Sequence, residues 1–395
     1  MSAKVRRQKE GKMEIDLNEL LLKAMHNRAS DIHFKVGQPP IFRIDGELIP
    51  VEGYPSLSSS EVAKLAYQLM SERQREHFLK NREIDMGYGV AGIGRFRVNI
   101  FQQRGTIAIA LRVIPFGIKG FEELNLPVRP LEKLSMEQRG LILVTGVTGS
   151  GKTTTLAAMI DYINRHRRCH IITIEDPIEF LHKDNLSMIN QREIGTDTSS
   201  FAQALKMALR QDPDVILVGE MRDFETIDTA LLAAETGHLV LSTLHTLDAT
   251  ETINRIVAVY PPYQQKQVRL QLANVLRGVI SQRLLPRADG LGRVPAVEVM
   301  INTARIKECI MDKDRTPEIP IAIAEGHVTY GSQTFDQSLM SLYKRGLITL
   351  EEALRHCSNP DDFVLRVKGI LATSDMGWQE FEVSAKEELE VEEEE

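Results

Sequence analysis

The residues best suited to chemistry form a glycine-rich loop between an apolar segment and a helix-like segment. The run LILV at 141–144 precedes this loop, which reads GVTGSGKTT over 146–154. The pattern is G-x-x-x-x-G-K-S/T in its required place between a strand and a helix. Glycines let backbone N–H groups face phosphate oxygens, and the start of the helix adds partial positive charge. We expect phosphate to be bound by Thr148, Gly149, Ser150, Gly151, Lys152, Thr153 and Thr154.

Two side chains of the loop have distinct expected roles. Lys152 can reach the β and γ phosphates of a triphosphate, and the Thr153 hydroxyl can ligate Mg²⁺. A plain glycine turn is the alternative, but it gives no use to a lysine and a threonine at the start of a helix. The sequence lacks the Asn-Lys-x-Asp element that reads guanine. The predicted cofactors are therefore ATP and Mg²⁺, and a GTPase is the weaker interpretation.

Carboxylates follow two apolar strand candidates. The segment ITIEDPIEF at 172–180 runs from a strand into an acidic cluster, and DVILVGE at 214–220 ends in Gly-Glu. Sites in parallel α/β sheets form at the carboxyl ends of strands, so we expect these acids beside the γ-phosphate. Glu179 is the best candidate for the general base that orients water. Glu220 is expected to hold Mg²⁺ or position water, and a solvated acidic loop is the alternative for the first cluster.

A histidine and two arginines complete the candidate site. His245 follows the apolar strand LVLSTL, where a contact with the γ-phosphate is expected, whereas His238 before that strand is expected to be structural. Phosphoryl transfer needs guanidinium groups that stabilise the charge of the transition state. Arg97 and Arg112 lie in strand-like segments outside the loop's domain. We expect them to act on ATP held by a neighbouring subunit.

The order of the predicted elements indicates two domains. Residues 13–115 group helices apart from strands, which is typical of an α+β domain; RFRVNIF at 95–101 alternates with period two. Residues 116–134 contain two prolines and read as a linker. Strands and helices then alternate over 135–300, which predicts a mostly parallel sheet covered on both faces. Residues 301–372 read as helices, 1–12 as a flexible extension, and 373–395 as an acidic, disordered tail.

Composition excludes several classes of protein. The three cysteines lie far apart among 395 residues, which argues against a disulfide framework or a cysteine zinc site and suits the cytosol. No apolar run approaches the roughly 20 residues of a membrane span. The basic N-terminus has no apolar segment after it, so we do not expect a secretory signal. A net charge of −7 argues against a dedicated nucleic-acid binder, and no nucleic acid is expected as a partner.

Taken together, the motifs resemble the secretion-type ATPase superfamily, and most closely the PilT-like retraction motors of type IV pili. The segments that carry the resemblance are GVTGSGKTTTLAAMI, ITIEDPIEF, the NQREIG stretch, LRQDPDVILVGEMRD and AAETGHLVLSTLHT. The resemblance implies a PAS-like domain at 13–115 and a RecA-like ATPase core at 135–300. It assigns Lys152 and Thr153 to nucleotide and Mg²⁺, Glu179 to the general base and Glu220 to the Walker B role. It assigns His245 to the sensor of the His box, and it matches Arg97 and Arg112 to the arginines that the N-terminal domain presents to bound ATP.

The same resemblance implies a ring of six identical subunits at the cytoplasmic face of the inner membrane. Its partner would be the inner-membrane platform protein of the pilus, and its activity pilus retraction, which drives twitching motility. Pilus-assembly ATPases carry an extra N-terminal domain and a tetracysteine zinc site; this sequence has neither, which favours retraction. The stretch 305–310 reads RIKECI where retraction motors resemble AIRNLI. An accessory, PilU-like ATPase that works beside a paralogous motor, an assembly or type II secretion ATPase, a regulatory ring subunit and a RecA-type nucleic-acid motor are the alternatives.

Overall fold

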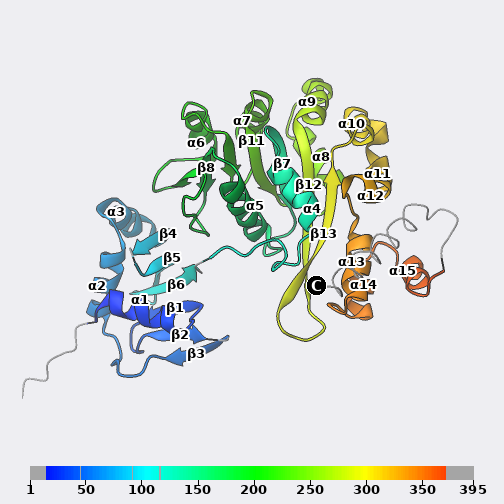
Figure 1. Cartoon of the computed structure of the whole chain (residues 1–395). Helices are drawn as coiled ribbons and strands as arrows, with labels where there is room; N and C mark the ends of the chain where they lie inside the picture. The colour runs from blue at the N-terminus through cyan, green and yellow to red at the C-terminus, as the bar shows by residue number, and fades with distance from the viewer. Residues whose placement is uncertain (1–14, 45, 91, 115–116, 371–395) are drawn as a thin grey trace, which may run out of the picture. The chain divides into compact units, whose positions relative to one another are not determined.

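The computed structural model describes residues 15–370 apart from residues 45, 91, 115 and 116. Contacts between residues divide the chain into a first unit, Met1–Phe116, and a second unit, Gly117–Glu395 (Figure 1). The extension expected at 1–12 and the tail expected at 373–395 lie outside the described residues. No helix within the described part of the chain combines the length and the apolar character needed to cross a bilayer.

The first unit is an antiparallel sheet with helices packed against one of its faces. Its six strands lie in the order β3-β2-β1-β6-β5-β4. The strands are β1 (Asp31–Lys35), β2 (Ile41–Ile44), β3 (Glu47–Pro50), β4 (Glu83–Val90), β5 (Gly94–Gln103) and β6 (Thr106–Ile114). The helices are α1 (Leu17–His26), α2 (Ser59–Leu69) and α3 (Glu72–Asn81).

Strand β5 shows why this sheet has one covered and one open face. Phe96, Val98 and Ile100 are fully buried in the core with α1 and α2, whereas Arg97 and Asn99 between them are exposed. Successive side chains of a strand point to opposite faces, so the alternating sequence determines which face is covered. The period-two pattern predicted for this segment is confirmed.

The second unit is built on a larger sheet of seven strands in the order β13-β12-β7-β11-β10-β8-β9. The strands are β7 (Gly140–Thr145), β8 (His170–Glu175), β9 (Met188–Glu193), β10 (Val215–Val218), β11 (Leu239–Leu244), β12 (Leu276–Pro286) and β13 (Arg293–Ile301). Strands β7 to β12 are parallel to their neighbours, and β13 pairs antiparallel with β12. Every residue of β7, β10 and β11 is buried, as the continuous apolar runs predict.

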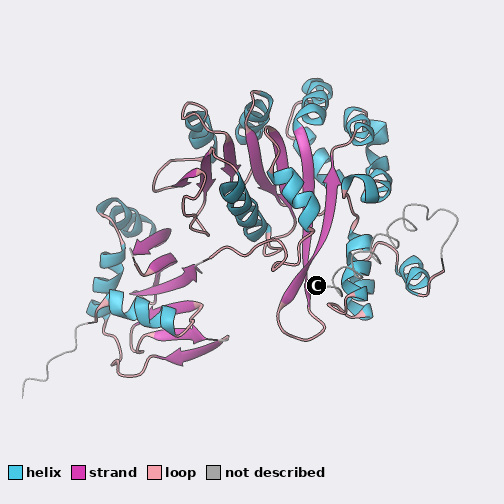
Figure 2. Cartoon of the chain, in the orientation of Figure 1, coloured by secondary structure: helices cyan, strands magenta, loops and turns pink. Residues whose placement is uncertain are grey.

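Helices cover both faces of this sheet (Figure 2). Helices α4 (Val128–Ser135) and α5 (Lys152–His166) share a core with one face. The other face packs against α6 (Phe201–Ala208), α7 (Phe224–Glu235), α8 (Ala249–Ala258), α9 (Pro262–Val275), α10 (Ala304–Met311) and α11 (Ile319–Glu325). The remaining helices are the 3-10 helix η1 (Lys313–Glu318), α12 (His327–Tyr330), α13 (Phe335–Lys344), α14 (Leu350–His356) and α15 (Pro360–Val367).

The segment 116–134, which reads as a linker in the sequence, contributes most of its apolar residues to the second unit. The residues that enter its core are Phe121, Leu126, Leu131 and Leu134. Two prolines in this segment suggest a loop, but Pro127 occupies the N-cap position of α4 and Pro130 lies in the first turn of that helix. Proline is tolerated there because the first N–H groups of a helix have no partner within it.

Candidate functional site

The glycine-rich loop connects the end of β7 to the start of α5, as the sequence predicts. Its glycines have positive φ angles: 141° at Gly146, 80° at Gly149 and 95° at Gly151. A β-carbon added at Gly146 would lie 2.4 Å from the carbonyl oxygen of Gln282 on β12. Only glycine therefore allows the loop to pass this close to the neighbouring strand. Lys152 is the first residue of α5, so the loop and the helix start form one anion-attracting surface.

Lys152 is held beneath the loop by backbone acceptors. Its Nζ donates to the carbonyl oxygens of Gly146 at 2.9 Å and Val147 at 3.0 Å. Burial lowers the pKa of this ammonium, and the charges of Glu220 and Glu179 oppose the shift. Both carboxylates are thus close enough to act on the lysine, although they come from different segments of the chain. The structure brings together the cation and the two acids that the sequence selects.

The acidic cluster after β8 separates into one buried carboxylate, Glu175, and two exposed ones, Asp176 and Glu179. Glu175 is buried and accepts hydrogen bonds from the Thr173 hydroxyl at 2.6 Å and the Gln191 amide at 3.2 Å. Burial raises the pKa of Glu175. Glu179 is exposed in the following loop. The expectation that the whole cluster borders the phosphate therefore does not extend to Glu175, whose carboxylate accepts hydrogen bonds inside the protein. Of the two exposed acids, Glu179 is the one whose charge acts on Lys152.

Glu220, Arg222 and His245 meet at the ends of β10 and β11. The carboxylate of Glu220 lies 2.8 Å from Nη2 of Arg222 and 3.8 Å from Nε2 of His245. Burial lowers the pKa of His245, and the charges of Lys152 and Arg222 lower it further, against the opposing effect of Glu220. His245 is therefore mainly neutral at pH 7, and its ring can accept or donate one hydrogen bond.

Three neighbouring polar residues hold the connections between strands, including His238, which the sequence assigns to structure. The Asp223 side chain caps α7 by accepting from the Thr226 N–H at 2.9 Å. Asp214 accepts from the His170 N–H at 2.8 Å. The ring Nδ1 of His238 lies 2.9 Å from the carbonyl oxygen of Ala233. These contacts shape the connections between strands, whereas the charge of Glu220 acts on Lys152 and that of Lys152 acts on His245.

The oxygen donors at this edge fit a magnesium ion. The Thr153 hydroxyl, at the start of α5, and the Glu220 carboxylate are hard oxygen ligands of the kind that Mg²⁺ prefers. Within the described residues, no three His, Cys, Asp or Glu side chains gather in a cage that would hold a metal by protein groups alone. Such a partial set matches the usual binding of Mg²⁺, in which one or two protein oxygens act together with phosphate oxygens and water.

Strand β12 contributes residues that the sequence reading overlooks. The side-chain amide of Gln282 donates to the Thr155 hydroxyl in the first turn of α5 at 2.8 Å. The backbone carbonyl oxygen of Gln282 lies against Gly146. Ser281 binds the Thr145 hydroxyl at 3.1 Å, directly before the loop. The Ser-Gln pair inside the apolar run VISQRLL is the signal in the sequence, because buried polar side chains need hydrogen-bond partners.

Arg97 and Arg112 are cross-strand partners on the open face of the first unit's sheet. They pair in register between β5 and β6. Arg97 forms an ion pair with Asp85 at 2.6 Å, and Arg112 one with Asp31 at 3.0 Å. Their side chains remain 44% and 72% exposed, so both guanidinium groups are accessible to an anion.

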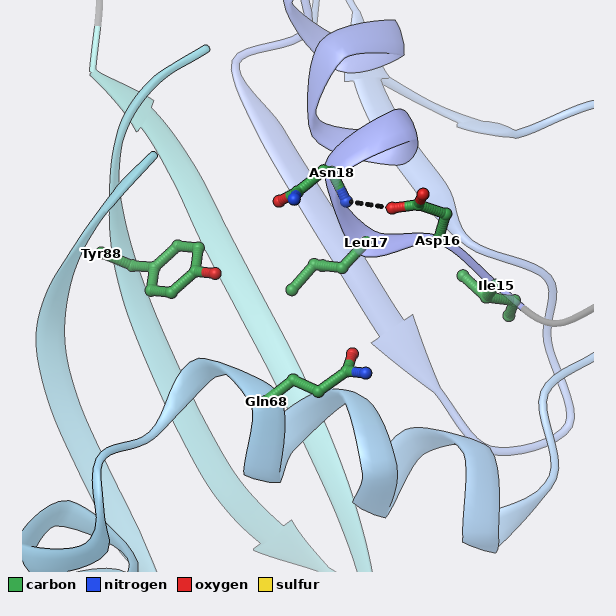
Figure 3. A pocket seen from close by; sticks show the side chains of 6 residues that line it. All are labelled: Ile15, Asp16, Leu17, Asn18, Gln68 and Tyr88. Carbon is green, nitrogen blue, oxygen red and sulfur yellow. Dashed lines mark hydrogen bonds between the residues drawn. The ribbon is translucent and has the colours of Figure 1, made fainter. Parts of the chain in front are cut away.

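A separate pocket of about 390 Å³ lies in the first unit, lined by Ile15, Asp16, Leu17, Asn18, Gln68 and Tyr88 (Figure 3). Tyr88 on β4 is the cross-strand partner of Phe96 on β5, whose side chain is buried on the helical face of the sheet. Arg97 follows Phe96 in the strand, so its side chain points to the opposite face. The carboxylate of Asp16 already caps α1 by accepting from the Asn18 N–H at 2.9 Å. This pocket is therefore on the helical side of the sheet and does not include the arginine pair.

Comparison with known proteins agrees with this architecture. Residues 6–355 match the family model of type II/IV secretion system proteins. The chain is 45% identical over 349 residues to the type IV pilus retraction ATPase PilT of Pseudomonas aeruginosa, which covers 88% of this chain and 100% of that protein. It is 41% identical over 354 residues to the type IV pilus ATPase PilU of the same species, covering 90% of this chain and 92% of that protein.

A solved structure extends the similarity to three dimensions. The crystal structure of the pilus retraction motor PilT with bound ADP matches with a TM-score of 0.80 and 49% identity, covering 88% of this chain and 98% of that chain. The predicted fold class, a RecA-like ATPase domain after a small PAS-like domain, is confirmed by this match and by the two sheets described above. The chain therefore belongs to the type II/IV secretion system protein family, in its PilT-like branch.

Proposed function

We propose that this protein is an ATP-hydrolysing motor that drives retraction of type IV pili. The observation that carries the proposal is the convergence of Lys152, Glu220 and His245 at the carboxyl ends of β7, β10 and β11, with the charge of Glu179 acting on the same lysine. A phosphate loop facing a carboxylate and a neutral histidine is suited to cleaving the terminal phosphate of a nucleotide. The similarity to PilT supports a pilus as the structure on which this ATPase acts.

In the proposed reaction, the loop residues from Thr148 to Thr154 bind the phosphates of ATP through backbone N–H groups. Lys152 neutralises the charge of the β and γ phosphates. Thr153 and Glu220 would hold Mg²⁺, which neutralises charge developing on the phosphate oxygens when it is bound. Glu179 orients the attacking water and accepts its proton, since its carboxylate is exposed in the loop after β8 and its charge acts on Lys152. His245 contacts the γ-phosphate and senses its release.

Six copies assemble into a ring in this proposal, and each site is completed by a neighbour. Arg97 and Arg112 of one subunit stabilise the transition-state charge on ATP held by the next. Differential binding of ATP and of its products then changes the arrangement of the two units in each subunit. The ring acts at the cytoplasmic face of the inner membrane on the platform protein of the pilus.

The test combines a biochemical and a cellular measurement on the same variant. Lys152→Ala should abolish phosphate release by the purified protein, because the cation that neutralises the phosphates is removed. In cells, deletion of the gene should leave excess surface pili that fail to retract, and the wild-type gene but not Lys152→Ala should restore twitching. Normal hydrolysis by Lys152→Ala would reject the site, and normal twitching in the deletion strain would reject the main-motor role.

An accessory retraction ATPase is the second candidate. The similarity to PilU covers as much of the chain as the similarity to PilT, and α10 reads ARIKECIM in place of a stretch resembling AIRNLI. Under this alternative, the deletion strain retains twitching while a paralogous motor is active. Purified protein would still release phosphate, and Lys152→Ala would abolish that release. The two candidates therefore predict different twitching in the deletion strain and the same phosphate release by the purified protein.

A further inference from the structure

A buried carboxyl group lies on β13. This strand pairs with β12, which is the strand that the phosphate loop contacts. The Glu298 side chain is only 6% exposed. Its Oε1 accepts a hydrogen bond from the Ala249 N–H at 2.8 Å and another from the Ser281 hydroxyl at 3.2 Å. Neither contact is between neighbours in the sequence. Glu298 thus joins three elements, β13, β12 and the start of α8.

The hydrogen bonds continue from Glu298 to the phosphate loop. The Ser281 hydroxyl accepts from the Thr145 hydroxyl at 3.1 Å, and Thr145 is the last residue of β7, immediately before Gly146. All three side chains are buried. A series of buried hydrogen bonds polarises its members and fixes their relative positions more firmly than one exposed bond would.

The other bond of Glu298 leads to the histidine of the candidate site. Ala249 is the first residue of α8, and the short connection from His245 to Asp248 precedes it. The N–H groups at the start of a helix have no acceptors within that helix, so Glu298 satisfies one of them from outside. The carboxylate is thereby attached to both segments that border the proposed γ-phosphate position, the loop after β7 and the segment after β11.

The surroundings of Glu298 make its charge costly. Burial and the nearby Asp248, the N-cap of α8, raise the pKa of Glu298 to about 7, although the bonds from Ala249 and Ser281 and the charge of Arg283 oppose the shift. Asp248 and Arg283 are the ionisable groups whose charges act on it. A buried acid in this position lowers stability relative to a neutral side chain of the same shape. Its presence therefore calls for a role that the neutral isostere would not fulfil.

We propose that Glu298 is a positioning residue that ties the phosphate loop to the His245 segment through Ser281, Thr145 and the start of α8. This inference rests on the proposed ATP hydrolysis, because it concerns the alignment of two parts of that site. Glu298 itself touches no nucleotide-binding residue. The ionised carboxylate forms charge-assisted bonds to both donors, which are roughly twice as strong as neutral ones.

The test compares Glu298→Gln with wild type across pH 6 to 9. Glutamine keeps the shape and an acceptor oxygen, so ATP binding should change little, and the thermal midpoint at pH 8 should not fall, because a buried charge is removed. We expect kcat at pH 8 to fall about 5- to 10-fold, with KM for ATP within about 2-fold, because removal of the charge weakens both bonds and so affects alignment more than binding. The wild-type kcat should decline below about pH 7, and this inflection should be absent in Glu298→Gln.

Two further variants separate alignment from general damage. Ser281→Ala breaks the middle of the series and should lower kcat in the same way, without adding fully to Glu298→Gln in the double variant. Ser338→Ala is the matched control: its buried hydroxyl accepts from the N–H of Val297, the residue beside Glu298, but belongs to α13. It should leave kcat and its pH profile unchanged.

The outcomes distinguish this inference from the proposed function. If the wild-type protein does not hydrolyse ATP, the proposed function fails. If the wild type hydrolyses ATP and Glu298→Gln shows the same kcat and the same inflection, Glu298 has no positioning role. Equal losses in Ser338→Ala and Ser281→Ala would likewise overturn the inference, because they would indicate a general response of the sheet.

Discussion

The close approach of the phosphate loop to β12 leads to a sharp prediction for Gly146→Ala. The added β-carbon would lie 2.4 Å from the Gln282 carbonyl oxygen and 2.5 Å from the Ser150 hydroxyl, where ordinary contacts begin at 3.4 Å. The loop must therefore move by roughly 1 Å from a backbone that cannot rotate away. A displacement of that size in a site costs about 100-fold in rate. The φ of 141° at Gly146 adds strain of about 1–3 kcal/mol for a residue with a side chain.

Gly237→Ala is the matched control for the effect of backbone strain. Gly237 has a φ of 117° and no atom within 4 Å of an added β-carbon. It precedes β11, at the end of the sheet opposite to the phosphate loop. Gly237→Ala should lose about 1–3 kcal/mol in the free energy of unfolding and keep its kcat.

Gly146→Ala should lose more free energy of unfolding and about 100-fold or more of its phosphate-release rate. Urea denaturation and steady-state phosphate release on the two variants measure these differences. Equal stability and equal activity of the two variants would refute the argument that β12 holds the loop by direct contact.

Other predictions concern the base, the arginines and the buried acid. Glu179→Gln should bind ATP normally and hydrolyse it at least about 100-fold more slowly, and normal single-turnover hydrolysis would exclude Glu179 as the base. Arg97→Ala and Lys152→Ala proteins should each be inactive, and mixed rings should regain phosphate release because some interfaces keep both residues; no recovery would count against arginines supplied by a neighbour. The pKa of Glu298 is raised from 4.5 unfolded to about 7 folded, so the folded state binds more protons between these values and stability falls as pH rises through them. The loss should be about 3 kcal/mol between pH 4.5 and pH 7 in wild type and absent in Glu298→Gln, as measured by denaturation midpoints.

Local patterns explain which parts of the site could be predicted from the sequence. The phosphate loop is contiguous, and its glycines, lysine and threonine have a fixed spacing. Glu220 and His245 follow continuous apolar strands, and the ends of parallel strands meet at one edge of the sheet. The distinction between Glu175 and Glu179 was only partly predictable, because Glu175 is held inside the protein by hydrogen bonds from Thr173 and Gln191. The bond from Gln191 requires the pairing of β8 with β9, which the sequence does not encode locally.

Strand β12 could not be recognised by the same means. Helix α9 ends at Val275 and β12 begins at the next residue, Leu276, so no loop separates the two elements, and the nearest glycine, Gly278, lies inside the strand. Its segment LRGVISQRLLP has no polar–apolar alternation, because both faces of its first half are covered. A short apolar run after a helix is equally compatible with more helix. The contacts of Ser281 and Gln282 with the loop therefore appeared only when the strand order was known.

The support of the phosphate site continues beyond β12 to the C-terminal helices. Strand β13 is an edge strand, and an exposed edge leaves backbone groups without partners. The chain around α13 covers it: the Ser332 and Ser338 hydroxyls accept from the N–H groups of Ile301 and Val297, and Gln333 bonds to Val299. Since β13 pairs with β12 along its whole length, and β12 holds the loop, these helices act on the site through continuous backbone pairing. Loss of a single contact, as in Ser338→Ala, leaves the backbone pairing of β13 with β12 intact and should not change hydrolysis. Mutations that unfold α13 as a whole should reduce hydrolysis before they unfold the sheet, because β12 then loses its outer support while the buried centre of the sheet, β7, β10 and β11, keeps its core.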